Sequence, residues 1–180
     1  DKTVKKISPS GEEIWTFSEH RSVVESVAVD DDSVYSGSKD KTVKKISPSG
    51  EEIWTFSGHS EGVYSVAVDN NGNVYSGSWD KTVKKISSSG ELIWTFSEHR
   101  NVVDSVTVDN NGNIYSGSAD KTVKKISPSG EEIWTFSEHR SVVESVAVDD
   151  DSVYSGSKDK TVKKLLVKAP PKSVGYKILE

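Results

Sequence analysis

The sequence predicts an all-β protein, a β-propeller built of four-stranded antiparallel blades with about 40 residues per blade. Residues 1–39 recur letter for letter at 120–158, with variants at 40–79 and 80–119. Each repeat holds four short segments rich in β-branched and aromatic residues, and the links between the segments are tight. A module of this kind cannot bury its apolar face alone, so the copies must stack on one another.

The second repeat shows the four expected strands: TVKKI (42–46), EIWTF (52–56), VYSVAV (63–68) and NVYSGS (73–78). The links SPSG, SGHSEG, DNNG and WDK are too short for the crossovers that parallel strands need, so neighbouring strands are expected to be antiparallel. The outer repeats shorten DNNGN to DDDS, a change that a hairpin tip tolerates. The main alternative, a β-helix, usually has shorter and parallel coils.

These residues resemble a known family. SGSWDKTV at 76–83, preceded by Gly-His at 58–59, closely resembles the blade of WD-repeat proteins, and the resemblance covers residues 1–164. It implies a buried hydrogen-bond network in each blade, formed by a His before the innermost strand, a Ser on the next strand and an Asp in the following turn. By position, the His and Asp residues are His20, His59, His99, His139, Asp40, Asp80, Asp120 and Asp159.

The chain departs from the WD-repeat pattern at one position in each blade. The Trp of the signature dipeptide is replaced by Ile46, Ile86, Ile126 or Leu165. The outer strand instead carries Trp15, Trp54, Trp94 or Trp134, similar to the docking Trp of quinoprotein-type propeller repeats. We therefore expect the network to end at the Asp, and the packing between blades to differ from that of WD-repeat proteins.

The resemblance also implies the strand order, with the His-led strand innermost and the Trp strand outermost. The chain then reads as a single propeller, or propeller fragment, over residues 1–180. Its parts are an outer strand pair of an incomplete blade at 1–18, and four blades at 19–57, 58–97, 98–137 and 138–180. The last blade has a divergent outer pair, TVKKLLV and GYKIL. Either a half-blade before residues 1–18 is missing, or residues 1–18 complete the blade begun by 142–157 and displace the C-terminal tail.

Four blades are few for repeats of this type, and an unpaired blade face invites association. We therefore expect a homo-oligomer, a dimer that closes a ring of about eight blades.

The composition of the chain limits the kinds of partner that it can bind. The net charge of −5, from 23 Lys and Arg against 28 Asp and Glu, argues against nucleic acid. The sequence holds no apolar run long enough to span a bilayer and no signal peptide. It contains no Cys and no Met, so we expect a trimmed or processed start. None of these features indicates a compartment.

The residues that could carry chemistry have structural explanations. Ser, His and Asp recur together four times, which is typical of a structural network rather than of a catalytic triad. The Asn-Gly runs at 69–73 and 109–113 are explained as hairpin turns, without a calcium site. Lys45 and its equivalents are expected to meet Glu51 or Glu52 across the ladder, which leaves little field for a polyanion.

Differences between the repeats mark the candidate binding site. They concentrate around the His loop and before the network Asp, on the rim that WD-repeat proteins commonly use for partners. The residue before the Asp is Lys39, Trp79, Ala119 or Lys158, and five positions after the His it is Glu25, Tyr64, Asp104 or Glu144. The binding residues predicted on this basis are Trp79, Tyr64, Arg21 and Arg100. Aromatic residues beside Arg are typical of interaction hot spots, although Trp79 could instead pack on the neighbouring loop.

The sequence therefore favours a non-catalytic binding scaffold that engages a peptide or protein on the His-loop rim, with no cofactor and no metal. One alternative is a carbohydrate-binding propeller lectin, whose aromatic residues stack on sugars, although only one blade carries the aromatic pair. Another is a recently amplified or engineered repeat protein with no tuned ligand site. A quinoprotein-type enzyme would need a funnel of cofactor and metal ligands, which no cluster of His or carboxylate residues in the sequence supplies.

Overall fold

Residues 1–166, which the computed structural model describes, form seventeen β-strands and no helix. The strands are β1 (Val4–Ile7), β2 (Glu13–Phe17), β3 (Val24–Val29), β4 (Val34–Ser38), β5 (Val43–Ile46), β6 (Glu52–Phe56), β7 (Val63–Val68), β8 (Val74–Ser78), β9 (Val83–Ile86), β10 (Leu92–Phe96), β11 (Val103–Val108), β12 (Ile114–Ser118), β13 (Val123–Ile126), β14 (Glu132–Phe136), β15 (Val143–Val148), β16 (Ser152–Ser157) and β17 (Val162–Leu166). Over these residues, therefore, no helix has the length and apolar character needed to cross a membrane.

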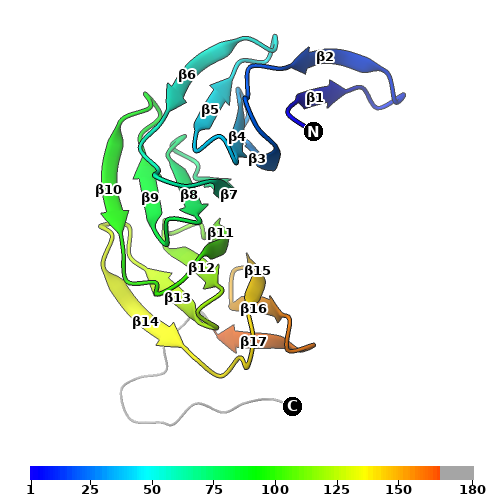
Figure 1. The fold of residues 1–180 in the computed structure, drawn as a ribbon. Coiled ribbons are helices and arrows are strands. Elements are labelled where there is room, and N and C mark those ends of the chain that lie inside the picture. Colours follow the sequence, from blue (N-terminus) through cyan, green and yellow to red (C-terminus); the bar gives the residue numbers. More distant parts are fainter. Residues whose placement is uncertain (167–180) are drawn as a thin grey trace.

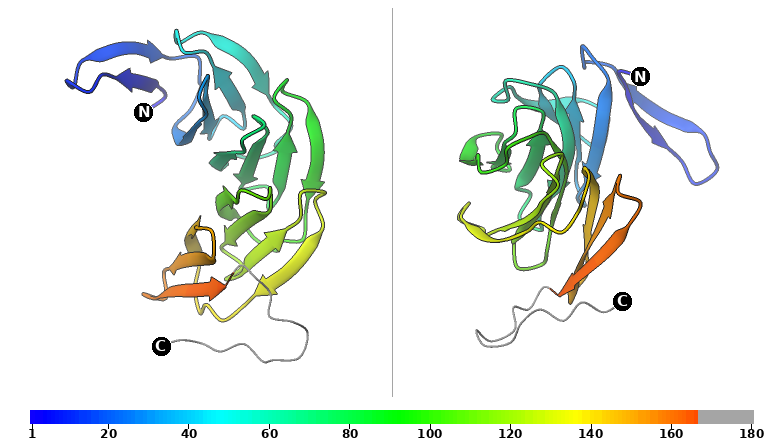
Figure 2. Two further views of the ribbon diagram at one scale, coloured as in Figure 1. Left: turned by 180° about the vertical axis from the view of Figure 1, so that it is seen from behind. Right: turned by 60° about the horizontal axis from the view of Figure 1, so that its bottom comes forward.

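The strands form antiparallel sheets in which each strand pairs with its neighbours in sequence. We call β3–β6 blade 1, β7–β10 blade 2, β11–β14 blade 3 and β15–β17 blade 4; β1 and β2 form a separate two-stranded sheet. The blades stand side by side along an open arc, with β3, β7, β11 and β15 on its concave side and the Trp-bearing strands on its convex side (Figures 1 and 2). The predicted fold class, an all-β propeller of four-stranded antiparallel blades, is confirmed.

Two strands begin one residue later than the sequence indicates. Thr42 lies outside β5 because its backbone N–H and its hydroxyl both bind the carboxylate of Asp40 in the preceding turn. Asn73 lies outside β8 because its backbone N–H and its side-chain amide bind the carboxylate of Asp69. In both cases a side chain competes with the sheet for the backbone donor.

A close approach between the second strand of one blade and the innermost strand of the next holds adjacent blades together. A Cβ atom at Gly37 in blade 1 would lie only 2.8 Å from Val63 Cγ1 and 3.0 Å from Val66 Cγ1 in blade 2. Gly77 and Gly117 have the same relation to the Val pairs of blades 3 and 4. Only glycine leaves room for these valines, so each valine pair reaches the apolar core between two blades.

The outer-strand tryptophans form a second contact between blades. Trp15 Nε1 donates to the carbonyl oxygen of Pro48 at 3.0 Å, in the β5–β6 turn of the next blade. Gly50 completes that turn with a φ of +88°, and a Cβ there would lie 2.9 Å from the Trp15 ring. Trp54 and Trp94 repeat this docking on the turns of the following blades. The outer-strand Trp residues therefore join neighbouring sheets through both the indole N–H and the ring.

The two ends of the arc do not pair with each other within the chain. β16 pairs with β17, not with β1, and β1 and β2 pair only with each other at the opposite end of the arc (Figure 1). Within one chain, residues 1–18 therefore do not complete the blade begun by 142–157. The second outer strand expected for blade 4, GYKIL, lies outside the described residues.

Candidate functional site

Each blade contains one His with a fully buried ring. His20 Nε2 lies 2.7 Å from Ser36 Oγ, and His20 Nδ1 lies 2.8 Å from Asp40 Oδ2. The same contacts, at 2.7 to 2.8 Å, join His59 to Ser76 and Asp80, His99 to Ser116 and Asp120, and His139 to Ser155 and Asp159. The structure thus brings together every His, Ser and Asp set that the resemblance implies.

The Asp of each network is surrounded by donors. Burial acts to raise the pKa of Asp40, but hydrogen bonds from Thr42, from His20 and from the backbone N–H of Arg21 outweigh burial and lower this pKa to about 2. Burial is likewise outweighed by hydrogen bonds from the Thr and His of the same blade at Asp80, Asp120 and Asp159, whose pKa values are lowered. All four carboxylates are therefore ionised at neutral pH and fix the loop before each innermost strand.

The networks lack the geometry of a catalytic triad. The Ser residues that contact the His rings have no exposed surface: Ser36, Ser76, Ser116 and Ser155. A nucleophile must be reached by its substrate, and a buried hydroxyl in a repeated, fully bonded set is not. The geometry of the four sets is that of a structural hydrogen-bond network.

One motif match was missed by the expectations from sequence. Residues 58–62 read Gly-His-Ser-Glu-Gly, which fits the G-x-S-x-G pattern of a nucleophile elbow. The structure places them in the loop before β7, with no following helix, and both ring nitrogens of His59 contact Asp80 and Ser76 instead of Ser60. Ser60 is exposed, and its backbone N–H donates to Asp80. The match therefore lacks both the turn and the base that the motif requires.

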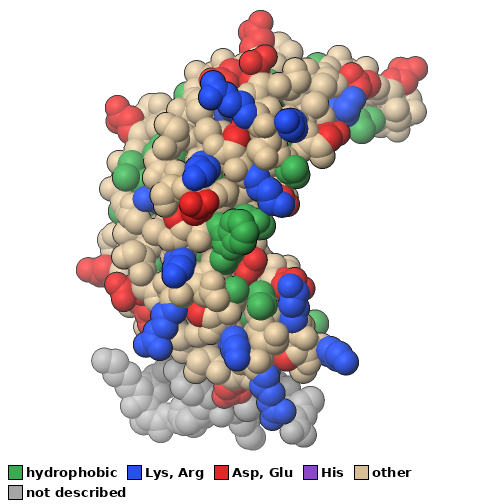
Figure 3. All heavy atoms as spheres, viewed as in Figure 1, with side chains coloured by type: hydrophobic (Ala, Val, Ile, Leu, Met, Phe, Trp, Pro, Cys, Tyr) green, Lys and Arg blue, Asp and Glu red, His purple; other side chains and the backbone are tan. Residues whose placement is uncertain are grey.

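The predicted rim residues Tyr64 and Trp79 do come together. Their ring centroids lie 5.8 Å apart, and the Trp79 side chain is 54 % exposed. The backbone N–H of Trp79 donates to the carbonyl oxygen of Gly62 in the His loop, which fixes this residue on the rim of blade 2. Lys39 of blade 1 places its Nζ 5.6 Å from the centre of the Tyr64 ring. An apolar patch accordingly interrupts the charged surface at the concave edge of the arc (Figure 3).

The repeat relates Trp79 to Asp104 as it relates Lys39 to Tyr64. Trp79 lies 40 residues after Lys39, and Asp104 lies 40 residues after Tyr64. Since Lys39 reaches over Tyr64 from the preceding blade, Trp79 occupies the corresponding position relative to Asp104 of blade 3. Asp104 Oδ2 is buried, and within residues 1–166 it has no hydrogen-bond partner. Burial raises the pKa of the Asp104 carboxyl, an effect that Lys158 opposes and Glu144 reinforces.

Blade 3 lacks the Lys that pairs with the rim carboxylate in blades 1 and 4. Lys39 Nζ lies 2.7 Å from Glu25 Oε1 in blade 1, and Lys158 Nζ lies 3.0 Å from Glu144 Oε1 in blade 4. The corresponding residue of blade 3 is Ala119, which has no charge to offer Asp104. The sequence differences located this rim position, but they did not indicate that Asp104 would be left without a cation of its own blade.

The two predicted arginines are separate from the aromatic pair. Arg21 and Arg100 are exposed in the loops before β3 and β11, in the blades on either side of blade 2. Their backbone N–H groups donate to the network Asp residues. Within residues 1–166, no hydrogen bond, ion pair or cation–π contact joins either side chain to Tyr64 or Trp79. The structure thus brings together two of the four predicted binding residues.

The prediction that Lys45 meets Glu51 or Glu52 across the ladder is wrong. Lys44 Nζ lies 2.7 Å from Glu52 Oε2, whereas Lys45 Nζ lies over the Tyr35 ring, 5.4 Å from its centre. Successive side chains of a strand point to opposite faces. The bulge in the β5–β6 ladder pairs Ile46 with Glu52, which puts Glu52 on the face of Lys44. Lys124 and Glu132 form the same pair in blade 3.

The Asn-Gly loops are held by internal hydrogen bonds. Asp69 Oδ1 accepts from the backbone N–H groups of Asn71 and Asn73, and Asp69 Oδ2 accepts from the Tyr75 hydroxyl. The loop beginning at Asp109 has the same bonds. The described part of the chain holds no group of three or more His, Cys, Asp or Glu residues suited to a metal ion.

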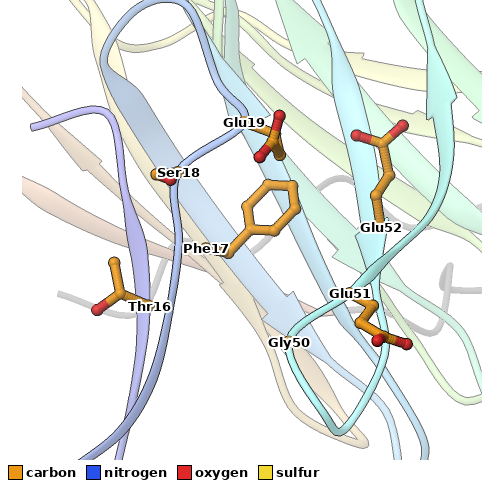
Figure 4. A pocket seen from close by; sticks show the side chains of 7 residues that line it. All are labelled: Thr16, Phe17, Ser18, Glu19, Gly50, Glu51 and Glu52. Carbon is orange, nitrogen blue, oxygen red and sulfur yellow. The ribbon is translucent and has the colours of Figure 1, made fainter.

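An open groove between β2 and the β5–β6 turn has an acidic lining (Figure 4). It is lined by Thr16, Phe17, Ser18, Glu19, Gly50, Glu51 and Glu52. The Phe17 ring and Glu19 lie on one side of the groove and Glu51 and Glu52 on the other (Figure 4), and Glu52 is already paired with Lys44. Three carboxylates around one groove disfavour a polyanion there.

Comparisons with known proteins agree with this architecture. A sequence profile of the family described as "Outer membrane protein assembly factor BamB" matches three overlapping stretches, residues 1–98, 39–127 and 79–168. No curated protein is significantly similar to the chain in sequence.

Two similar solved structures are computationally designed proteins. The crystal structure of the Ika4 protein superposes with a TM-score of 0.80 at 28 % identity, over 88 % of this chain and 99 % of Ika4. The Ika8 protein superposes with a TM-score of 0.83 at 29 % identity, over 93 % of this chain and 53 % of Ika8. The chain thus spans nearly all of Ika4 and about half the length of Ika8.

Proposed function

We propose that this chain, which belongs to the family described as "Outer membrane protein assembly factor BamB", is a non-catalytic scaffold that engages a peptide or protein on the His-loop rim. The observation that carries the proposal is the pair of adjacent aromatic rings on blade 2, Tyr64 and Trp79, of which Trp79 is half-exposed. Solvent-facing Trp and Tyr side chains are typical anchors of interfaces. The finer resemblance to WD-repeat blades supports the choice of this rim.

The ligand group that fits the site is a basic side chain. A Lys or Arg of the partner would occupy the position that Ala119 leaves open and would pair with the buried carboxylate of Asp104. Its cationic head would lie against the indole of Trp79, an arrangement worth about 1 to 2 kcal/mol when it is desolvated. The negative charge of Asp104, which is partly withdrawn from water, would then be balanced by the cation of the partner.

A peptide selection tests the proposal directly. We expect a randomised displayed peptide library, selected on the wild-type protein, to yield peptides that contain Lys or Arg. The matched variant is Ala119→Lys, which supplies the cation that blades 1 and 4 already have and should weaken a selected peptide at least tenfold. The exposed substitution Glu98→Ala, at the outer end of the next loop, is the control and should bind as wild type.

Three other outcomes would overturn the proposal. Failure to enrich any peptide would favour a recently amplified or engineered repeat protein with no tuned site. Binding on a glycan array that is lost in Trp79→Ala would favour the lectin, since aromatic rings also stack on sugar faces. Equal binding by wild type and Ala119→Lys would remove the rim site even if a peptide is found.

A further inference from the structure

We propose that two copies of this chain close one ring by exchanging strands: β1 of each copy pairs with β16 of the other copy, in the place that β17 occupies in the open chain, and β2 follows β1 as the outermost strand. The surfaces at the two ends of the arc carry this inference. Each end repeats one half of the interface that joins the blades inside the chain. The inference is independent of the rim site.

The second strand at one end of the arc, β16, is complementary to the innermost strand at the other end, β3. At every internal interface a valine of the next blade lies against the glycine of the preceding blade, as Val66 lies against Gly37. At one end of the arc, a Cβ on Gly156 would meet, among residues 1–166, only Ser145 of its own blade, at 4.0 Å. At the other end, Val27 is 55 % exposed, while Val66 is 6 % exposed. One end therefore has a vacant glycine site and the other has the unburied valine that fits it.

A hydrogen bond repeats between the innermost strands of successive blades. Ser26 Oγ of blade 1 accepts from the backbone N–H of Val66 in blade 2 at 3.1 Å. Ser65 and Ser105 accept in the same way from the next blades, at 3.0 and 3.1 Å. Ser145 is the fourth member of the series, and the repeat would place Val27 of a second copy opposite it.

The sheet of β1 and β2 lacks the neighbours that bury its equivalents. Ile7 is 60 % exposed, whereas Ile46, Ile86 and Ile126 at the same position of blades 1 to 3 are 0 % exposed. Gly11 has the φ of +86° that its equivalents show, but a Cβ there would meet nothing within 4 Å. Its equivalents each lie against a Trp of the preceding blade. In the ring, Trp134 of the second copy would dock on Gly11.

The chain contains two strands that can occupy the place beside β16. Residues 1–6 and 159–164 share the sequence DKTVKK, so β1 can adopt the register that β17 has against β16. β1 also continues into β2, which supplies a fourth strand and its Trp. The open arc of one chain spans about half of a similar designed protein, which agrees with two copies per ring (Figure 1).

The register makes a cross-linking experiment specific. β16 pairs Tyr154 with Lys164 of β17, and the exchange would pair Tyr154 with Lys6 of the other copy. Because the chain has no Cys, oxidation of a Lys6→Cys, Tyr154→Cys variant reports only this contact. We expect a covalent dimer of about twice 19.7 kDa on a non-reducing gel. The variant Lys164→Cys, Tyr154→Cys is the matched control for β17, and we expect little cross-linking in it.

Three results would overturn the inference. An intrachain disulfide in the Lys6→Cys, Tyr154→Cys variant would mean that one chain closes on itself. No disulfide, together with full cross-linking of the control, would mean that β17 stays in place. A wild-type mass near 19.7 kDa by light scattering would mean that no second copy binds.

A further variant separates association from folding. Gly156→Val places a side chain where the structure has space within one chain, but it fills the site expected for Val27 of the second copy. We expect this variant to have the wild-type circular dichroism spectrum and half the wild-type mass. A Gly156→Val variant that keeps the dimer mass would contradict the proposed seat. Gly37→Val fills the same site inside the chain and should instead lose the folded spectrum.

Discussion

Lys44 and Glu52 form an ion pair across β5 and β6 at 2.7 Å, whereas in blade 2, where Lys84 is the equivalent of Lys44, Leu92 stands at the position of Glu52. Lys84 keeps only its bond to the Thr95 hydroxyl, at 2.9 Å. The near-identical repeats thus contain the same site with and without its carboxylate.

Leu92→Glu should restore that pair in blade 2. Leu92 is about half exposed, so its loss costs little, and a partly exposed ion pair contributes about 0.2 to 1 kcal/mol. We expect the free energy of unfolding in urea to rise by that amount at low salt and the gain to shrink in 1 M NaCl. Leu92→Gln, which has the shape without the charge, is the control; an equal gain in this variant would show that charge is not the cause.

The two serines near His59 should respond differently to truncation. Ser76 is fully buried and contacts His59 Nε2, so Ser76→Ala leaves a buried ring nitrogen without its partner. We expect a loss of about 1 to 3 kcal/mol in the free energy of unfolding. Ser60→Ala removes the exposed hydroxyl of the G-x-S-x-G match and should change stability by less than about 0.5 kcal/mol. Equal losses for the two variants would contradict the assignment of Ser76, rather than Ser60, to the network.

Acid should weaken the protein through the network carboxylates. In the unfolded chain an Asp has its ordinary pKa of about 3.9, while the pKa of Asp40 in the folded protein is about 2. The unfolded state therefore binds more protons between these values, and protonation favours unfolding. We expect the stability from Asp40 to be complete above about pH 5 and to fall progressively as the pH drops toward 2. Urea unfolding at a series of pH values measures this, and a flat profile from pH 5 to 2.5 would rule it out.

Asp104 should behave in the opposite sense. Its raised pKa means that the folded protein holds this proton more tightly than the unfolded chain does, so ionisation at higher pH opposes folding. Asp104→Asn should therefore stabilise the free protein at pH 7 and reduce the affinity for a peptide that carries Lys or Arg. Thermal unfolding and peptide titration together check this trade-off. A variant that is both less stable and equally good at binding would contradict the role given to the carboxylate.

The sequence predicted those features that depend on local patterns repeated four times. Period, strand type and tight links fix the blades, and the outer-strand Trp indicates docking because its indole N–H needs an acceptor on the next blade. Features that depend on neighbours across the sheet were missed. The choice of Lys44 over Lys45 follows from a ladder bulge, which no spacing in the sequence shows.

Two further features could not be seen in the sequence. Lys41 and its equivalents adopt a φ of about +75°, a conformation for which Gly or Asn would have been the signal. Asp104 Oδ2 is left without a partner in the described residues where blade 3 has Ala119 in place of the Lys of blades 1 and 4, and the sequence alone does not show that this oxygen is buried.

We assign a structural role to the repeated His–Ser–Asp sets and a binding role to the rim residues that differ between the repeats. The affinity of a selected basic peptide for Trp79→Ala, measured by isothermal titration beside the thermal midpoint, tests this division most directly. Trp79 is half-exposed and joins no buried network, so we expect the midpoint to stay within about 2 °C and the affinity to fall tenfold or more. An unchanged affinity would contradict the division, because the one exposed aromatic anchor on the rim would then contribute nothing to binding.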